Sequence, residues 1–259
     1  MSTILSALTA LDLAPGGRVL DAGCGSGPHL GHFARAVGPG GLVVGLDRDV
    51  AALRRASAAR EELQRQGTVV LCAGDHDAPP FADATFDLVW LSATLHHAPD
   101  PATTLFALRR LVRPSGQIAV LDADEAGSFP FLPWPPDFEA RLRAASAAAA
   151  LAGYDGALPY RYHPYLGRAL PALFRTAGLQ GVRLLPLAEI TRAPLGPDRA
   201  AAIHGWFTGP FLGRVGPFLA PRDRDHLLRL VAPTGADSLL SSPDFFLART
   251  WFLGIGHVP

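Results

Sequence analysis

The chain has 259 residues, enough for one large domain with a buried core. All 23 basic residues are arginine, because the sequence contains no lysine, and it contains no asparagine either. These absences exclude a lysine Schiff base, a GxxxxGK(S/T) phosphate loop and N-glycosylation. The net charge is zero, and no run exceeds two consecutive arginines, so the chain lacks the concentrated basic face that nucleic acid binding requires.

The sequence also carries signals for the cellular compartment. Cys24 and Cys72 lie at predicted strand ends, which indicates a reduced cytosol rather than a disulfide. The N-terminus lacks the basic region of a signal peptide, and no apolar stretch approaches the roughly 18 residues that cross a bilayer. We therefore expect a cytoplasmic protein without a membrane partner.

The first half alternates between apolar runs of strand length and segments rich in helix formers. Near-continuous apolar runs are typical of strands buried on both faces, and their alternation with helices predicts a parallel, doubly wound α/β sheet. The predicted strands are 18–21, 42–47, 68–72, 86–91 and 117–122, and the predicted helices are about 28–37, 50–65 and 102–112.

This alternation breaks after residue 122. A proline-rich aromatic segment, an alanine-rich helix and a stretch holding all four tyrosines follow, before a helix and a strand return. We predict one domain spanning 1–259, with helical insertions at about 124–165 and 190–243 that form a lid over one edge of the sheet. The later predicted elements are helix 139–152, helix 166–177, strand 182–189, a helical region 197–235 and strand 245–254.

The most informative motif is a glycine loop after the first strand. Gly23, Gly25 and Gly27 allow a tight turn and the close approach of a ligand. The dinucleotide fingerprint GxGxxG would need a third glycine where this chain has Pro28. The loop alone therefore does not identify the ligand.

Three carboxylates follow successive strands at this edge. Asp21, Asp47 and Asp75 would converge on the crevice at the topological switch point, where a pyrophosphate would meet uncompensated negative charge. A ligand with an ammonium, a sulfonium, ribose hydroxyls and an adenine amine would instead find acceptors. Asp47 could bind a ribose diol, Asp75 could accept from the adenine amine, and His76 could donate its backbone N–H to the ring.

Together these motifs resemble the class I S-adenosylmethionine-dependent methyltransferases. The resemblance rests on DxGxGxG at 21–27, Asp47, Gly74-Asp75, PPFADATFDLVW at 79–90, LSATLHH at 91–97 and the following LRRLVRPSGQIAVLD. The last group is similar to the ubiquinone/menaquinone-biosynthesis-like branch, which methylates small molecules. The family implies a Rossmann-like, mostly parallel seven-stranded sheet and S-adenosylmethionine as cofactor.

The resemblance also implies which residues hold the cofactor. The glycine loop would contact the methionine portion, the end of the second strand the ribose, the third strand end and its surroundings the adenine, and the fourth strand end the methionine amine. In that order the residues are Asp21, Gly23, Cys24, Gly25 and Gly27; Asp47; Arg48, Asp75 and His76; and the backbone of Leu91 and Ser92.

Signals for the acceptor are weaker. His96 and His97 could act as a general base, or one of them could cap or pack the following helix. His29, in the glycine loop, is more typical of a residue that starts a helix than of one that contacts the substrate. Asp122 and Asp124 follow the fifth strand, but their spacing dictates no metal geometry, and we predict no metal site.

Aromatic residues of the first insertion could form a substrate wall, and ordinary lid packing would explain them nearly as well. Two arginines could pair with an acceptor carboxylate. The wall candidates are Trp134, Tyr154, Tyr160, Tyr162 and Tyr165, together with Phe131, and the arginines are Arg161 and Arg168.

The segment after the fourth strand excludes two nucleic-acid branches of the family. It reads Ser92-Ala-Thr-Leu, which is neither the (N/D)PPY loop of amino-methylating enzymes nor the cysteine loop of cytosine-C5 enzymes. We predict methyl transfer to an O, N or C atom of a small molecule. A cyclase or other non-methylating enzyme on the same fold, or a binding module, are the alternatives, and the sequence carries no signal for the oligomeric state.

Overall fold

The computed structural model describes residues 3–58, 68–153 and 163–259. The chain divides into two compact units, each treated separately below. The first comprises residues 1–123, 165–187 and 251–259, and the second comprises 124–164 and 188–250. The second unit is thus built from the two segments predicted as insertions, and their role as a lid remains a prediction.

The first unit contains the alternating strands and helices expected from the sequence. Its elements are α1 (Thr3–Leu8), β1 (Arg18–Ala22), α2 (Leu30–Val37), β2 (Leu42–Asp47), α3 (Val50–Ala58), β3 (Thr68–Ala73), β4 (Phe86–Ser92), the 3-10 turn η1 (Leu95–His97), α5 (Pro101–Arg109), β5 (Val112–Asp122) and α7 (Leu166–Thr176). Strands β6 (Gln180–Arg192) and β7 (Phe246–His257) each belong to both units.

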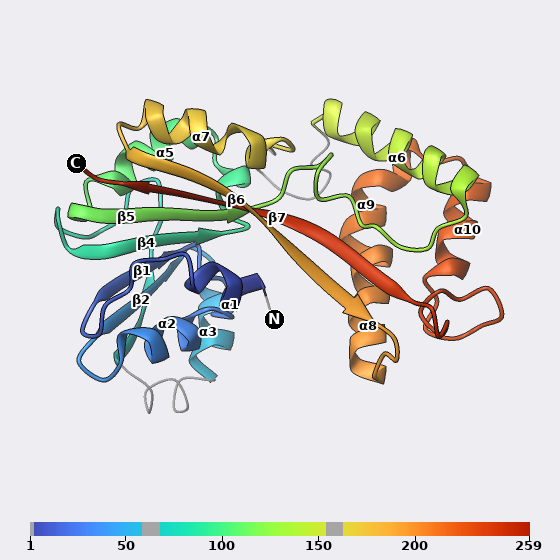
Figure 1. Cartoon of the computed structure of the whole chain (residues 1–259), viewed down its shortest axis with the longest axis horizontal. Helices are drawn as coiled ribbons and strands as arrows, with labels where there is room; N and C mark the ends of the chain where they lie inside the picture. Colours follow the sequence, from blue (N-terminus) through green and yellow to red (C-terminus); the bar gives the residue numbers. More distant parts are fainter. Residues whose placement is uncertain (1–2, 59–67, 154–162) are drawn as a thin grey trace. The chain divides into compact units, whose positions relative to one another are not determined.

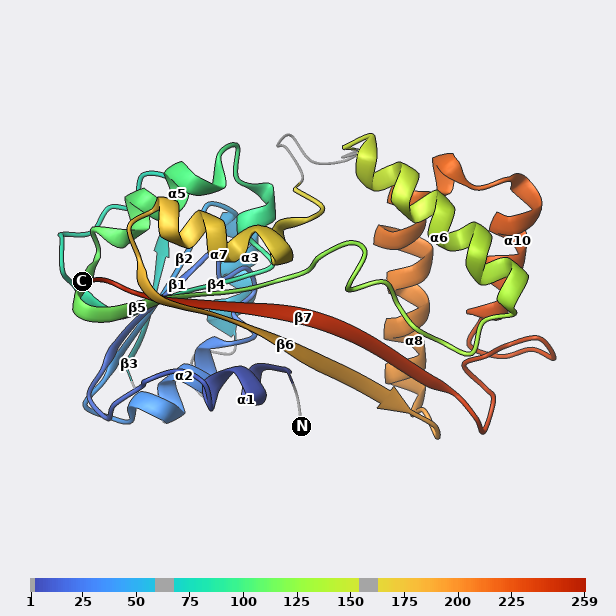
Figure 2. The ribbon, with the colours of Figure 1, turned by 45° about the horizontal axis from the view of Figure 1, so that its top comes forward.

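These strands form one seven-stranded sheet in the order β3-β2-β1-β4-β5-β7-β6. Strands β1 to β5 are parallel to one another, and β7 runs antiparallel to β5 with Gln117 opposite His257 and Asp122 opposite Phe252. In the first unit, helices flank this sheet (Figures 1 and 2). The predicted Rossmann-like, mostly parallel sheet is confirmed.

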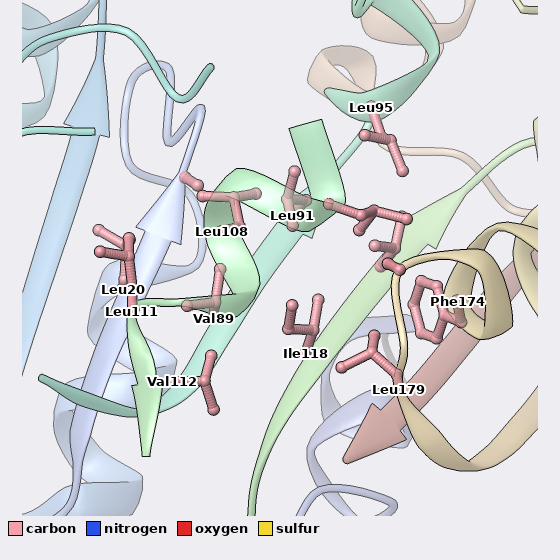
Figure 3. Packing of buried hydrophobic residues seen from close by; sticks show 14 of the residues in the cluster. Leu20, Val89, Leu91, Leu95, Leu108, Leu111, Val112, Ile118, Phe174 and Leu179 are labelled. Carbon is pink, nitrogen blue, oxygen red and sulfur yellow. The ribbon is translucent and has the colours of Figure 1, made fainter. Parts of the chain in front are cut away.

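Helices cover both faces of the sheet in the first unit, which explains why its strands are apolar throughout. One face packs against α5 and α7, and the other against α1, α2 and α3. Figure 3 shows the first of these clusters, in which Leu20, Val89, Leu91 and Ile118 from the strands meet Phe174 and other side chains from the helices.

Strand β5 differs most from its predicted bounds. It begins at Val112 rather than 117, so it includes Pro114 and Gly116. The strand passes this point with a register shift against β4, and Ser115 adopts a positive φ of 66° while its N–H bonds to the carbonyl of Val258. The chain bends here without ending the strand.

The second unit has its own hydrophobic core of aromatic and aliphatic side chains. Its helical elements are α6 (Pro136–Leu151), α8 (Pro197–Trp206), the π-helical turn η2 (Phe207–Phe211), α9 (Leu212–Val215), the 3-10 turn η3 (Gly216–Phe218) and α10 (Pro221–Leu230). An isolated bridge between Phe131 and Ala248 ties the first inserted segment to the start of β7. Among the described residues, no helix is both long and apolar enough to cross a membrane.

Candidate active site

The candidate active site lies at the edge of the sheet where β1 to β5 end. These strands are parallel, so their carboxyl ends meet at one edge, where α/β proteins bind ligands. The strands end at Ala22, Asp47, Ala73, Ser92 and Asp122. All of these residues belong to the first unit.

The glycine loop after β1 needs glycine for two different reasons. Gly23 and Gly27 have φ values of 79° and 78°, and a Cβ would lie 2.4 Å from Thr94 at the first and 2.7 Å from Leu30 at the second. Gly25 has a φ of 55°, but a Cβ there would meet no heavy atom within 4 Å. The space beside Gly25 is therefore open to a ligand.

Asp47 holds the loop in place. Its Oδ2 accepts the Gly25 N–H at 2.7 Å, and its Oδ1 accepts the Asp49 N–H at 2.8 Å. The carbonyl of Leu46, one residue earlier, accepts the N–H groups of Gly23 and Cys24. The end of β2 thus fixes the start of the glycine loop, and the Asp47 carboxylate faces the loop backbone.

Asp21 is the most unusual group of the site. Its side chain is 1% exposed, and within the described residues its Oδ2 has no hydrogen-bond partner. Burial and the charge of Asp47 raise its pKa to about 8. Unsatisfied buried oxygens are rare and destabilising. A cationic group of a ligand could supply the hydrogen-bond donor that this oxygen lacks.

The remaining predicted cofactor residues lie around this edge with different exposures. Leu91 is fully buried and Ser92 is half-buried at the end of β4, so backbone contacts suit them better than contacts through the leucine side chain. Arg48 and Asp75 are exposed, and His76 is half-buried. Their contacts with adenine remain predictions.

The thiol of Cys24 packs inward. The side chain is 4% exposed, and a Cβ at Gly45 would lie 2.9 Å from its Sγ. Burial raises the pKa of the thiol, which makes it a poor nucleophile. A role for Cys24 toward the cofactor is therefore confined to its backbone.

The structure brings Asp75, His76 and Asp77 together, with one possible ligand atom from each within 4.8 Å of the others. Exposed acidic groups gather in this way without a metal, and two of these side chains have other partners. Asp75 accepts the Asp77 N–H, and Asp77 accepts the hydroxyl of Thr104.

The two predicted histidines have different surroundings. His96 Nδ1 lies 2.7 Å from Oδ1 of Asp122, which is fully buried. Asp122 also accepts the backbone N–H groups of Ala123 and His96, so its carboxylate meets donors on both oxygens. The centroids of the His97 and His96 rings lie 3.9 Å apart, and burial, with the nearby charge of His96, lowers the pKa of His97 to about 4.

The predicted substrate wall is only partly described. Trp134 is 5% exposed, its ring packs against Phe138 and Phe207, and its indole N–H donates to the carbonyl of Pro130. This burial in the core of the second unit leaves little of the ring for a substrate, whereas Phe131 is 49% exposed.

Tyr165 is half-buried just before α7, with the Arg168 guanidinium 4.9 Å from the centre of its ring. Gly167 donates to the carbonyl of Ala123, which places the start of α7 beside the end of β5. The other wall candidates, Tyr154, Tyr160 and Tyr162, and also Arg161, lie outside the described residues.

Three features of the site are absent from the sequence predictions. The Thr94 hydroxyl donates to the carbonyls of Ser92 and Gly23 and so links the end of β4 to the glycine loop. Asp122 is the partner of His96, and the Trp90 indole donates to His29. The meeting of parallel strand ends could have indicated the pairing of Asp122 with His96, because Asp122 closes an apolar run at the same edge as His96.

Comparisons with known proteins agree on one family. A family model described as a methyltransferase domain matches residues 13–156. The nocamycin O-methyltransferase of Saccharothrix syringae is 39% identical over 113 residues, which are 44% of this chain and 40% of that protein. The chain thus spans less than two thirds of that relative's length.

A second relative is matched over more of its length. The 2-phytyl-1,4-naphtoquinone methyltransferase of Synechococcus elongatus is 32% identical over 180 residues, which are 67% of this chain and 76% of that protein. A solved structure from Bacillus halodurans, described as a candidate methyltransferase, has a TM-score of 0.59 at 17% identity and covers 99% of this chain and 98% of that one. This last likeness shows a shared fold.

Proposed function

This chain belongs to the S-adenosylmethionine-dependent methyltransferase family, and we propose that it transfers the methyl group to a hydroxyl oxygen of a small molecule, with His96 as general base. The predicted family, enzyme class and cofactor are confirmed by the family model and the relatives. The observation that carries the finer proposal is the contact between His96 and Asp122.

The residues at the strand ends fit the cofactor. Bound S-adenosylmethionine supplies a methyl group that its sulfonium has already activated. Asp21 offers a buried oxygen without a donor, which suits the ammonium of the methionine portion. Asp47 offers a carboxylate for the ribose hydroxyls, and the open space at Gly25 lets the ligand approach the backbone.

His96 has the arrangement of a general base. The Asp122 carboxylate accepts backbone N–H groups and can accept from Nδ1 only if that nitrogen carries the hydrogen. Nε2 of the neutral ring then carries the lone pair that would take the proton of the acceptor hydroxyl. Asp122 would stabilise the imidazolium formed in this step, as buried carboxylates do for catalytic histidines.

His97 is the weaker candidate for this role. Its ring is held neutral by burial, and a pKa near 4 makes it a poor proton acceptor at neutral pH. We propose that His97 supports the His96 ring by packing against it. This distinction between the two histidines can be tested directly.

The test is a transfer assay with methyl-labelled cofactor and a small-molecule extract, followed by mass spectrometry of the labelled product. Asp122→Asn keeps the shape of the side chain but removes its charge. Loss of a hydrogen bond to a charged group is worth about 1.5–3 kcal/mol, so kcat should fall about 10- to 150-fold while cofactor affinity stays unchanged. His96→Gln should lower kcat at least as much.

His97→Gln is the comparison, and it should lower kcat far less than His96→Gln. Equal losses in the two histidine variants would contradict the assignment of the base. Product formation without S-adenosylhomocysteine would instead favour a cyclase or another non-methylating enzyme, and cofactor binding without turnover would favour a binding module.

We further propose a cytoplasmic enzyme whose acceptor is neither nucleic acid nor a membrane component. The absence of a concentrated basic face supports this, as do the small-molecule names of the two methyltransferase relatives. We propose that Tyr165 and Arg168, at the start of α7 beside the end of β5, contact the acceptor. Label recovered only in nucleic acid or protein would contradict this part of the proposal.

A further inference from the structure

Trp90 lies at the centre of the sheet, in β4, and is fully buried. Its indole N–H is a donor only, and a buried donor needs an acceptor. The acceptor is Nδ1 of His29, at 3.2 Å, and the two rings pack edge to face with centroids 5.7 Å apart. A side chain two residues beyond Gly27 therefore satisfies a polar group of the core.

His29 occupies the position where the glycine loop ends and α2 begins. Its side chain makes no capping hydrogen bond to the helix, so the role typical of a helix start does not explain it. Its backbone carbonyl begins the helix by accepting the N–H groups of His32 and Phe33. The backbone of His29 thus belongs to the helix and its ring belongs to the contact with β4.

The contact with Trp90 fixes the form of the imidazole ring. Because the indole can only donate, His29 Nδ1 must be without hydrogen, and the neutral ring carries its hydrogen on Nε2. Protonation would add a hydrogen to Nδ1 and break the contact. Burial, with a smaller contribution from His32, lowers the pKa of His29 to about 4, so the ring stays neutral around neutral pH.

Different groups hold the two ends of the glycine loop, its entrance at residues 23–25 and its exit at His29. Asp47 and the carbonyl of Leu46 hold the entrance, and His29 ties the exit to Trp90. Residues 25–28 contribute two glycines, a serine and a proline, so the loop has few side chains that could order it by packing. Its position depends on these anchors.

We propose that His29 is a positioning residue for the cofactor, which holds the exit of the glycine loop against β4 through Trp90. This inference rests on the proposed function only for the identity of the ligand. Ordering a binding loop before the ligand arrives removes part of the free energy that binding would otherwise spend on that ordering. Loss of the anchor should weaken cofactor binding and leave the transfer step unchanged.

The variants separate the contact from the ring. His29→Phe keeps an aromatic ring but removes the acceptor, whereas His29→Asn places an amide oxygen near the position of Nδ1. His29→Phe should raise the Kd for S-adenosylhomocysteine, measured by calorimetry, about 3- to 10-fold, and His29→Asn should restore most of the affinity. In turnover, KM for the cofactor should rise with the Kd while kcat remains unchanged.

Trp90→Phe tests the same contact from the other side and serves if His29→Phe does not fold. It should raise the Kd to a similar extent, and adding His29→Phe to it should have little further effect. The matched control is His32→Asn, one turn along α2, whose ring Nδ1 lies 3.2 Å from the Arg35 guanidinium. This control should leave the Kd unchanged.

Two results would overturn the proposal. One is a lowered Tm for His29→Phe with an unchanged Kd, which would make the contact purely structural. The other is an Asn variant as weak as the Phe variant, which would show that the contact with Trp90 is not what matters. A wild-type protein that binds the cofactor but methylates no acceptor would refute the proposed function and leave this inference intact.

Discussion

Replacing Asp47 should separate cofactor binding from chemistry. The carboxylate makes two hydrogen bonds to backbone N–H groups, from Gly25 and Asp49, and it is the proposed ligand of the ribose hydroxyls. Two hydrogen bonds from the ribose hydroxyls to this charged acceptor, at about 1.5 kcal/mol each or more, correspond to about 3 kcal/mol of the free energy of cofactor binding. Asp47→Ala should therefore weaken cofactor binding about 100-fold, as measured by calorimetry with S-adenosylhomocysteine.

Two further variants make this test specific. Asp47→Asn retains one acceptor oxygen and should fall between the wild type and Asp47→Ala. Asp49→Ala is the control, because Asp49 is exposed and its Oδ1 accepts the Ala51 N–H at the start of α3. It should cost about 1 kcal/mol of stability and leave the affinity unchanged. A change below about threefold in Asp47→Ala would refute the assignment of this carboxylate.

Other positions give independent predictions. Gly27→Ala should destabilise the fold by about 1–3 kcal/mol in urea denaturation, because its Cβ would overlap Leu30 at a positive φ. Gly25→Ala, whose Cβ would enter open space, should lower stability by about 1–2 kcal/mol for its left-handed backbone, and calorimetry should show weaker cofactor binding. Gly256→Ala should destabilise by about 1–3 kcal/mol, since its Cβ would lie 2.8 Å from the Phe174 ring; an unchanged midpoint would contradict the packing of α7 on β7. Asp21 has a pKa of about 8 in the folded protein and about 4 when unfolded, so the folded state retains a proton that the unfolded state loses between these values. The free energy of unfolding should accordingly decrease as pH rises from about 4 to 8, and denaturation of Asp21→Asn should show a smaller decrease.

The sheet could be predicted from the sequence because its strands are buried on both faces. Such strands appear as continuous apolar runs, and the predicted runs at 42–47 and 86–91 match β2 and β4 to within one residue. The start of β5 could not be predicted in this way. Pro114 and Gly116 normally indicate a stop, and only the pairing partners show that the strand continues past them.

The site could be predicted only where backbone position decides the role. The glycine loop and the acidic strand ends follow from topology, since parallel strands end at one edge. The difference between His96 and His97 depends on the Asp122 side chain, 26 residues further along, and adjacent residues of one motif carry no information about it. For Trp134, an aromatic residue in a proline-rich segment could equally belong to a core or to a wall, and the buried bond to Pro130 shows the core.

Strands β6 and β7 each pass from one unit into the other without interruption, and this restricts how the second unit can change its length. Side chains along a strand alternate between two faces, so an insertion or deletion of one residue inside either strand would exchange the faces on one side of the change. Buried and exposed positions along the strand would then be interchanged in one unit, while the strand residues of the other unit would keep their original faces. Variation in length should therefore accumulate in the connection between α10 and β7, and a chimera that borrows the second unit from a relative should preserve the number of residues in both strands.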